Sequence, residues 1–215
     1  MSSDRLATAL ARFDALNAED PRRERDPVSG EEIAFEVLYA RRMTERLEQL
    51  APDAPEVLRL AVRAQHIARW RIPRESYPDG RVGYKRWRSQ LARAHADVAA
   101  GILGEVGYEA DAIRRVRELL LKQGLRRDPE VQTLEDVACV VFLEHYFADF
   151  ARKHERAKVV DIARKTWKKM SPRGQGAAAA LAGGLPVELR SILDDALAGE
   201  PPDAAPDADT APETD

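Results

Sequence analysis

The chain has 215 residues, of which 44% are hydrophobic and 33% are charged, and its formal net charge is −3. A chain of this length usually folds as one domain, and this apolar fraction is enough for one hydrophobic core. No uninterrupted apolar run approaches the roughly 18 to 20 residues of a membrane-spanning helix, so no membrane partner is expected.

The first residues carry acids and lack an apolar segment, so no signal peptide is expected. The lone Cys139 lies in an apolar run and has no second cysteine with which to form an intramolecular disulfide. A single buried cysteine of this kind fits a reducing compartment. These features predict a cytoplasmic protein.

Charge is distributed unevenly along the chain. The segment from Glu200 to Asp215 holds six acids, no base and four prolines. Because the whole chain carries −3, residues 1–199 carry +3. A segment with so little apolar surface does not fold, so we expect a disordered acidic tail over residues 199–215. Such a tail either keeps the protein in solution or competes for its basic surface.

Helical spacing of apolar residues dominates the rest of the chain, and strand signals are nearly absent. The spacing predicts eight helices separated by proline- and glycine-rich loops, over residues 6–16, 33–50, 56–70, 84–103, 111–121, 129–154, 158–170 and 186–197. Asp111 is expected to cap the fifth of them. The sequence therefore predicts an all-α protein with a single helical domain over residues 1–198.

Four ionisable residues lie on helical faces that are otherwise apolar: His66, His95, Glu135 and Asp136. A polar group in such a place costs free energy unless it has a partner, and two adjacent buried acids need a cation. His66, His95 and one of the acids could together supply nitrogen and oxygen ligands for a divalent metal. The alternative is a buried polar network without a chemical role.

Basic and aromatic residues follow His66 closely. Planar guanidinium groups crowded in this way suit phosphate or carboxylate, and basic residues interleaved with aromatic ones also suit a nucleotide or nucleic acid. The candidates for phosphate or substrate binding are Arg69, Arg74, Tyr84, Lys85 and Arg88. A second basic strip lies at residues 165–169. Solvated side chains are the alternative for most of these residues.

Several blocks of the sequence resemble an uncharacterised family, domain of unknown function 4202. The resemblance covers most of residues 5–195 and rests on the blocks AVRAQHIARW, PRESYP, GYKRWRSQLARAHA, QTLEDVACVVFLE and KTWKKMS. This family brings little functional information with it.

The order of motifs is also distantly similar to the HD-type metal-dependent phosphohydrolases, in which a divalent metal activates water against a phosphoester. This resemblance implies an orthogonal, HD-like helical bundle. It matches His66 to the histidine of the HD pair and Asp136 to the last acid. Ile67 stands where the aspartate of the pair would be, and Glu36 is the nearest substitute for the missing first histidine.

The sequence therefore predicts a metal-dependent phosphohydrolase-like protein that acts on a nucleotide or another phosphorylated small molecule. Its expected catalytic residues are His66, His95, Glu135 and Asp136, and its expected metal ligands are His66, His95, Asp136 and Glu36. The alternative is a non-catalytic nucleic-acid or nucleotide-binding module that uses the basic strips at residues 81–88 and 165–169.

Overall fold

A computed structural model describes residues 2–198 of the chain, so the expected acidic tail over residues 199–215 lies outside the described residues. The chain divides into two compact units, Met1–Leu134 (unit 1) and Glu135–Asp215 (unit 2). The prediction of one domain over residues 1–198 stays a prediction. No helix in the described part of the chain is long and apolar enough to cross a membrane.

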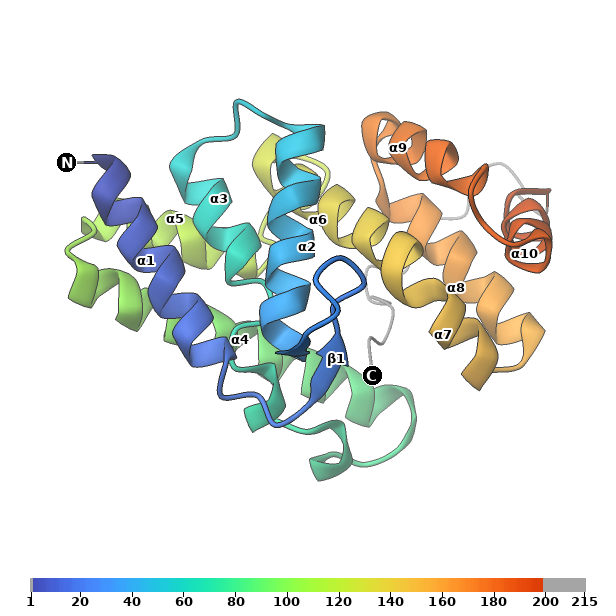
Figure 1. The fold of residues 1–215 in the computed structure, drawn as a ribbon, viewed down its shortest axis with the longest axis horizontal. Coiled ribbons are helices and arrows are strands. Elements are labelled where there is room, and N and C mark those ends of the chain that lie inside the picture. The colour runs from blue at the N-terminus through green and yellow to red at the C-terminus, as the bar shows by residue number, and fades with distance from the viewer. Residues whose placement is uncertain (1, 199–215) are drawn as a thin grey trace. The chain divides into compact units, whose positions relative to one another are not determined.

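Helices dominate both units, as the sequence predicts for an all-α protein (Figure 1). Unit 1 contains α1 (Ser2–Asn17), β1 (Arg23–Arg25), β2 (Glu32–Ala34), α2 (Phe35–Leu50), α3 (Glu56–Arg63), η1 (Arg69–Arg71), η2 (Arg74–Ser76), α4 (Gly80–Val106) and α5 (Ala110–Leu120). It also contains the start of α6 (Pro129–Val141), and this helix runs on into unit 2. The remaining elements of unit 2 are η3 (Phe142–Tyr146), α7 (Phe147–Lys153), α8 (Arg156–Lys169), α9 (Pro172–Ala182) and α10 (Val187–Ala198).

The core of unit 1 forms where α1, α2 and α3 pack on one another and α4 packs on α1 and α5 (Figure 1). The amphipathic spacing that predicted these helices buries one apolar stripe of each. The largest fully buried side chains of unit 1 are Phe13, Met43, Leu47, Leu58, Leu60, Ile67, Leu91, Leu103, Leu119 and Leu134. Burial of this apolar surface is the main stabilising contribution to unit 1.

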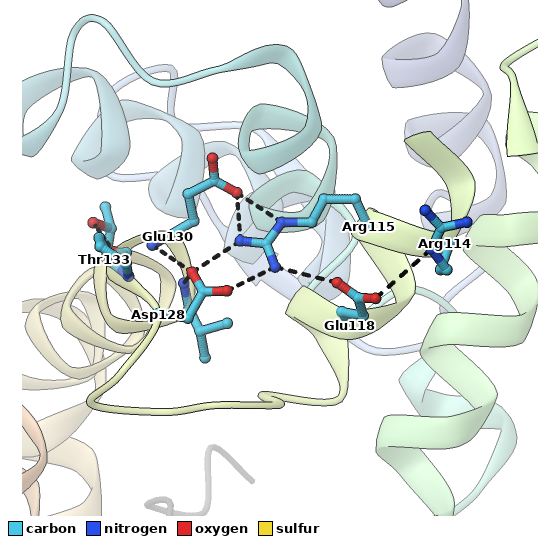
Figure 2. Close-up of polar contacts among 8 residues, drawn as sticks. Arg114, Arg115, Glu118, Asp128, Glu130 and Thr133 are labelled. Atoms are coloured by element: carbon cyan, nitrogen blue, oxygen red, sulfur yellow. Dashed lines mark hydrogen bonds and ion pairs between the residues drawn. The ribbon is translucent and has the colours of Figure 1, made fainter. Parts of the chain in front are cut away.

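An ion-pair network fixes the start of α6 to α5 (Figure 2). Arg115 donates hydrogen bonds to Asp128 and to Glu130, each about 2.7 to 2.9 Å long, and a longer one to Glu118. Asp128 also accepts from the backbone N–H of Glu130, in the first turn of α6. An acceptor at this position satisfies a helix N–H that would otherwise lack a partner.

Unit 2 packs α8 against α10 and α7, and α9 against η3. The predicted helix over residues 129–154 is present, but η3 interrupts it with one π-helical turn. Phe142 packs edge-on against Phe147 and Phe150 with ring centroids 5.8 Å apart in both pairs. The extra residue of a π-turn shifts the helical register, and such turns are frequent near functional sites.

Several predicted boundaries were wrong. Residues 23–25 and 32–34 pair as a short antiparallel hairpin that was not expected. Helix α9 was also missed, although Ser171 followed by Pro172 is a typical helix start, with the serine as the cap and the proline in the first turn. Glu109, not Asp111, precedes the first turn of α5. The predicted helix over residues 56–70 ends at Arg63, and this difference shapes the candidate site.

Candidate functional site

Four buried ionisable side chains gather in unit 1: Glu36, His66, Arg69 and His95, which we call the unit 1 cluster. None is more than 8% exposed. Glu36 comes from the first turn of α2, His66 from the turn after α3, Arg69 from η1 and His95 from the middle of α4. The cluster thus joins three of the residues singled out in the sequence with a candidate phosphate ligand.

The turn between α3 and η1 is what brings His66 and Arg69 to Glu36. Ala68 has φ 55° and ψ 28°, the left-handed conformation, which costs a residue other than glycine about 1 to 3 kcal/mol. His66 Nδ1 lies 3.7 Å from Glu36 Oε2, and Arg69 Nε lies 4.0 Å from Glu36 Oε1. A continuous helix through residues 63–69, as predicted, would not contain this left-handed residue.

His95 is held by the same turn. Its Nδ1 lies 2.7 Å from the carbonyl oxygen of Ile67, and because a carbonyl only accepts, Nδ1 must carry the hydrogen. The neutral ring therefore keeps its lone pair on Nε2. Burial lowers the pKa of His95 to about 3, against the opposing effect of the bond to Ile67, so this imidazole is neutral at pH 7.

His66 is an uncharged imidazole as well. Its ring stacks on Tyr39 with centroids 4.0 Å apart and planes 8° from parallel, and it lies 6.0 Å from the His95 ring. Burial, reinforced by the positive charge of Arg69, holds the pKa of His66 well below its usual value. The cluster therefore contains two neutral imidazoles.

Glu36 does not neutralise Arg69 fully. Burial raises the pKa of Glu36 to about 8, although Arg69 and Arg22 oppose this rise, so the carboxyl group is mostly protonated at pH 7. Burial lowers the pKa of Arg69 from its ordinary value, and Glu36 opposes this fall. The guanidinium still remains charged at pH 7, because an arginine side chain is not deprotonated in proteins near neutral pH. It also lies over the ring of Trp87, 4.8 Å from the centroid. The cluster thus holds a buried positive charge without a full counter-charge.

Three atoms of the cluster are buried without a hydrogen-bond partner among the described residues: Glu36 Oε2, His66 Nδ1 and Arg69 Nη1. An unsatisfied buried polar atom costs about 1 to 3 kcal/mol, and native proteins contain few of them. Three of them in one cluster are typical of a site whose side chains bond to a polar ligand.

Arg88 adds a second positive charge to this environment. It is half-buried on α4, and its charge lowers the pKa of His66, Arg69 and His95. It forms no hydrogen bond or ion pair within residues 2–198. Two guanidinium groups beside two neutral imidazoles favour an oxyanion.

The other candidate phosphate ligands lie before or within the first turns of α4. Arg74 Nη1 donates to the carbonyl oxygens of Tyr77 and Pro78, at 3.0 and 3.1 Å, so this side chain braces its own loop. Tyr84 and Lys85 are half-buried, and the Tyr84 ring lies 5.8 Å from that of Trp87. Their predicted role in phosphate binding stays a prediction.

Glu135 and Asp136 belong to unit 2 and have partners there. Asp136 accepts hydrogen bonds from the backbone N–H of Ser171, at 2.8 Å, and from the Ser171 hydroxyl. Glu135 Oε1 lies 3.8 Å from the Nζ of Lys169, which is the kind of cation that a buried acid needs. Both contacts hold α6 to the region where α8 ends and α9 begins.

The unit 1 cluster offers nitrogen and oxygen donors of the kinds that divalent metals bind. Catalytic zinc sites use three protein ligands, each about 2.0 to 2.2 Å from the metal. His66 Nδ1 and Glu36 Oε2 form one close pair of donors, but no group of three or more His, Cys, Asp or Glu side chains in the described part of the chain is arranged to hold a metal ion. Metal ligation by His66, His95, Asp136 and Glu36 stays a prediction.

Comparison with known proteins gives a family and no assigned function. A family model described as "Domain of unknown function (DUF4202)" matches residues 7–193 of the chain. No curated protein and no solved structure matches. The resemblance to the HD-type phosphohydrolases stays a prediction.

Proposed function

The chain belongs to the DUF4202 family of domains of unknown function, and we propose that it is a phosphohydrolase-like protein that binds a nucleotide or another phosphorylated small molecule at the unit 1 cluster. The observation that carries this proposal is the set of three unpartnered buried polar atoms beside the incompletely neutralised charge of Arg69. An oxyanion would supply both the missing hydrogen-bond partners and the missing negative charge.

Binding uses the two guanidinium groups. Arg69 donates through Nη1, and Arg88, whose charge acts on Arg69, donates to the same phosphoryl group. Charge-assisted hydrogen bonds between arginine and phosphate are stronger than neutral ones, and the low polarity around the cluster strengthens them further. The neutral imidazoles do not compete for the anion, and they can accept hydrogen bonds from a water or a ligand hydroxyl.

The same groups supply an acid and a base for hydrolysis of a phosphoester. A water attacks phosphorus and gives a proton to the Nε2 lone pair of His95, while the protonated Glu36 donates its proton to the leaving-group oxygen as the bond from phosphorus to that oxygen breaks. The pKa of His95 is low in the free protein, but a bound phosphoryl anion raises it because negative charge favours the imidazolium. One water is consumed and one alcohol and one phosphate are released.

Calorimetry with inorganic phosphate, together with phosphate release from a panel of nucleotides, tests this proposal. Both are run in chelator and again with added Mn²⁺ or Zn²⁺, because the resemblance to HD-type enzymes predicts a metal. Arg88→Gln should weaken phosphate binding roughly 10- to 100-fold, as expected when a charged hydrogen bond is lost. Arg86→Gln is the matched control, because Arg86 is exposed on the same helix.

Two outcomes would overturn the proposal: no phosphate binding by the wild-type protein under any of these conditions, or equal binding by the Arg88 and Arg86 variants. Tight binding of RNA or DNA that persists in Arg88→Gln and weakens steeply with salt would favour the nucleic-acid-binding alternative.

A further inference from the structure

Two fully buried polar side chains, Asn17 and Asp20, lie three residues apart at the end of α1 and in the turn after it. Each is 1% exposed. A buried amide and a buried carboxylate are costly unless they are paired. Both are paired with backbone N–H groups of segments that carry the unit 1 cluster.

Asn17 holds the strained turn between His66 and Arg69. Its Oδ1 accepts the backbone N–H of Ala68 at 3.1 Å. Ala68 is the residue in the left-handed conformation, and an outside acceptor for its N–H stabilises that conformation. The neighbouring Ile67 carbonyl is the acceptor that fixes His95, so this one bond supports three of the four cluster residues.

Asp20 holds the fourth cluster residue, Glu36. Its Oδ2 accepts the backbone N–H of Glu36 at 3.2 Å, and its Oδ1 accepts that of Arg22 at 2.9 Å. The first N–H groups of a helix have no partner within the helix, so Asp20 serves the start of α2 from a distant segment. Its negative charge also adds to the rise in the pKa of Glu36.

We infer that Asn17 and Asp20 are positioning residues of the unit 1 cluster, which set Glu36 against His66, Arg69 and His95 without touching the ligand. Neither side chain bonds to a cluster side chain. Their effect therefore passes through the backbone of residues 67–69 and of residue 36. The inference rests on the proposed function for its ligand, but it also makes a claim about His95 that needs no ligand.

The test compares Asn17→Ala with Asn17→Asp, which keeps an acceptor oxygen for the Ala68 N–H. Asn17→Ala should weaken binding of inorganic phosphate at least tenfold, and Asn17→Asp should restore most of the loss. In ¹⁵N-histidine NMR spectra of the free protein, Asn17→Ala should change the Nδ1–H signal of His95, because the Ile67 carbonyl moves with the turn. Asn17→Asp should keep the wild-type signal.

Asp14→Ala is the matched control. Asp14 also ties α1 to α3, through the side chain of Arg63 at 2.8 Å, but it does not bond to residues 64–69. This variant should lose stability while it keeps the wild-type His95 signal and phosphate affinity. A wild-type His95 signal in folded Asn17→Ala would overturn the inference, as would equal losses in Asp14→Ala. If no variant and no wild-type protein binds phosphate, the proposed function fails, and the NMR comparison still decides the positioning role.

Discussion

Gly83 lies in the second turn of α4, close to the backbone of Pro78. Adding one methyl group at Gly83 tests whether α4 packs against the loop that contains Pro78. A Cβ at Gly83 would lie 1.8 Å from the carbonyl oxygen of Pro78 and 2.7 Å from its carbonyl carbon. A Cβ atom essentially never lies within 3.0 Å of an atom to which it is not bonded. Gly83→Ala therefore forces the Pro78 backbone and the helix apart by more than 1 Å.

The cost follows from what holds Pro78 in place. Arg74 donates to the carbonyls of Tyr77 and Pro78, and a hydrogen bond from a charged donor contributes about 1.5 to 3 kcal/mol. Replacing glycine by alanine within a helix, without a clash, stabilises the folded state by about 0.5 to 1 kcal/mol. We expect Gly83→Ala to lower the free energy of unfolding by about 1 to 3 kcal/mol, or the melting temperature by roughly 2 to 12 °C.

Gly101→Ala is the control, because it lies on the same helix and its added Cβ would meet nothing within 4 Å. Without a clash, only the helix propensity remains, and this variant should gain about 0.5 to 1 kcal/mol. Thermal and urea unfolding followed by circular dichroism measure both variants. Equal stabilisation by the two substitutions would refute the reasoning, since it would mean that α4 and Pro78 are not in contact.

Three further predictions concern Gly174, Glu36 and Arg115. Gly174→Ala should lower the melting temperature, because its added Cβ would lie 2.7 Å from the Cγ of Asp136. Gly176→Ala, on the same helix, should raise the melting temperature, because its added Cβ would meet nothing within 4 Å. Two shifts of the same sign would contradict this prediction. Because burial raises the pKa of Glu36 to about 8 from 4.5, the folded state holds a proton that the unfolded state has lost between these pH values. The stability that this group contributes is present below about pH 4.5 and is lost as the pH rises through 8. In urea unfolding, the free energy of unfolding of Glu36→Gln should therefore rise relative to that of the wild type between pH 5 and pH 8. A constant difference between the two proteins would contradict the assignment. Arg115→Met should cost about 1 to 2 kcal/mol in low salt and less in 1 M NaCl, because its ion pairs are partly exposed; a cost independent of salt would show that packing dominates there.

The sequence identified the buried polar residues better than it identified their partners. His66 and His95 are expected to be buried because the predicted helices place them on faces with leucine and valine, and both residues are buried. Apolar periodicity reports which face of a helix is covered. It does not report which distant segment covers that face.

The end of α3 shows what periodicity cannot report. Residues 64–70 keep the composition of a helix, with two alanines, an isoleucine and no glycine or proline. The chain nevertheless leaves the helix after Arg63, and the Ala68 N–H bonds to the Asn17 side chain at the end of α1. A left-handed alanine whose N–H bonds to a residue 51 positions away leaves no local signal, so this turn could not be predicted from the sequence.

Asp20 and Gln65 show the same limit for polar residues. Asp20 precedes a proline in a polar stretch, which is typical of an exposed turn, but it is fully buried against the backbone of Glu36. Gln65 is buried, and its Oε1 has no hydrogen-bond partner among residues 2–198. Only the packing of α1 against α2 and α3 explains either position, and that packing depends on the whole core.

Substitutions at Ser171 test whether the buried Asp136 stabilises unit 2. The Ser171 hydroxyl donates to Asp136 and accepts the backbone N–H of Gly174 at 3.3 Å, so one side chain links α6 to the start of α9. Loss of a serine cap costs about 0.5 to 2 kcal/mol, and Asp136 would lose one of its two bonds to Ser171 as well.

We therefore expect Ser171→Ala to lower the free energy of unfolding by about 1 to 3 kcal/mol, while Ser171→Thr, which keeps the hydroxyl, stays close to the wild type. The urea unfolding of Ser171→Ala, Asp136→Ala and the double variant completes a thermodynamic cycle. A coupling energy of about 0.5 to 3 kcal/mol would show that Asp136 stabilises unit 2 through Ser171. Additive losses would mean that this carboxylate owes its burial to another interaction, and ligand binding would then be the next role to test.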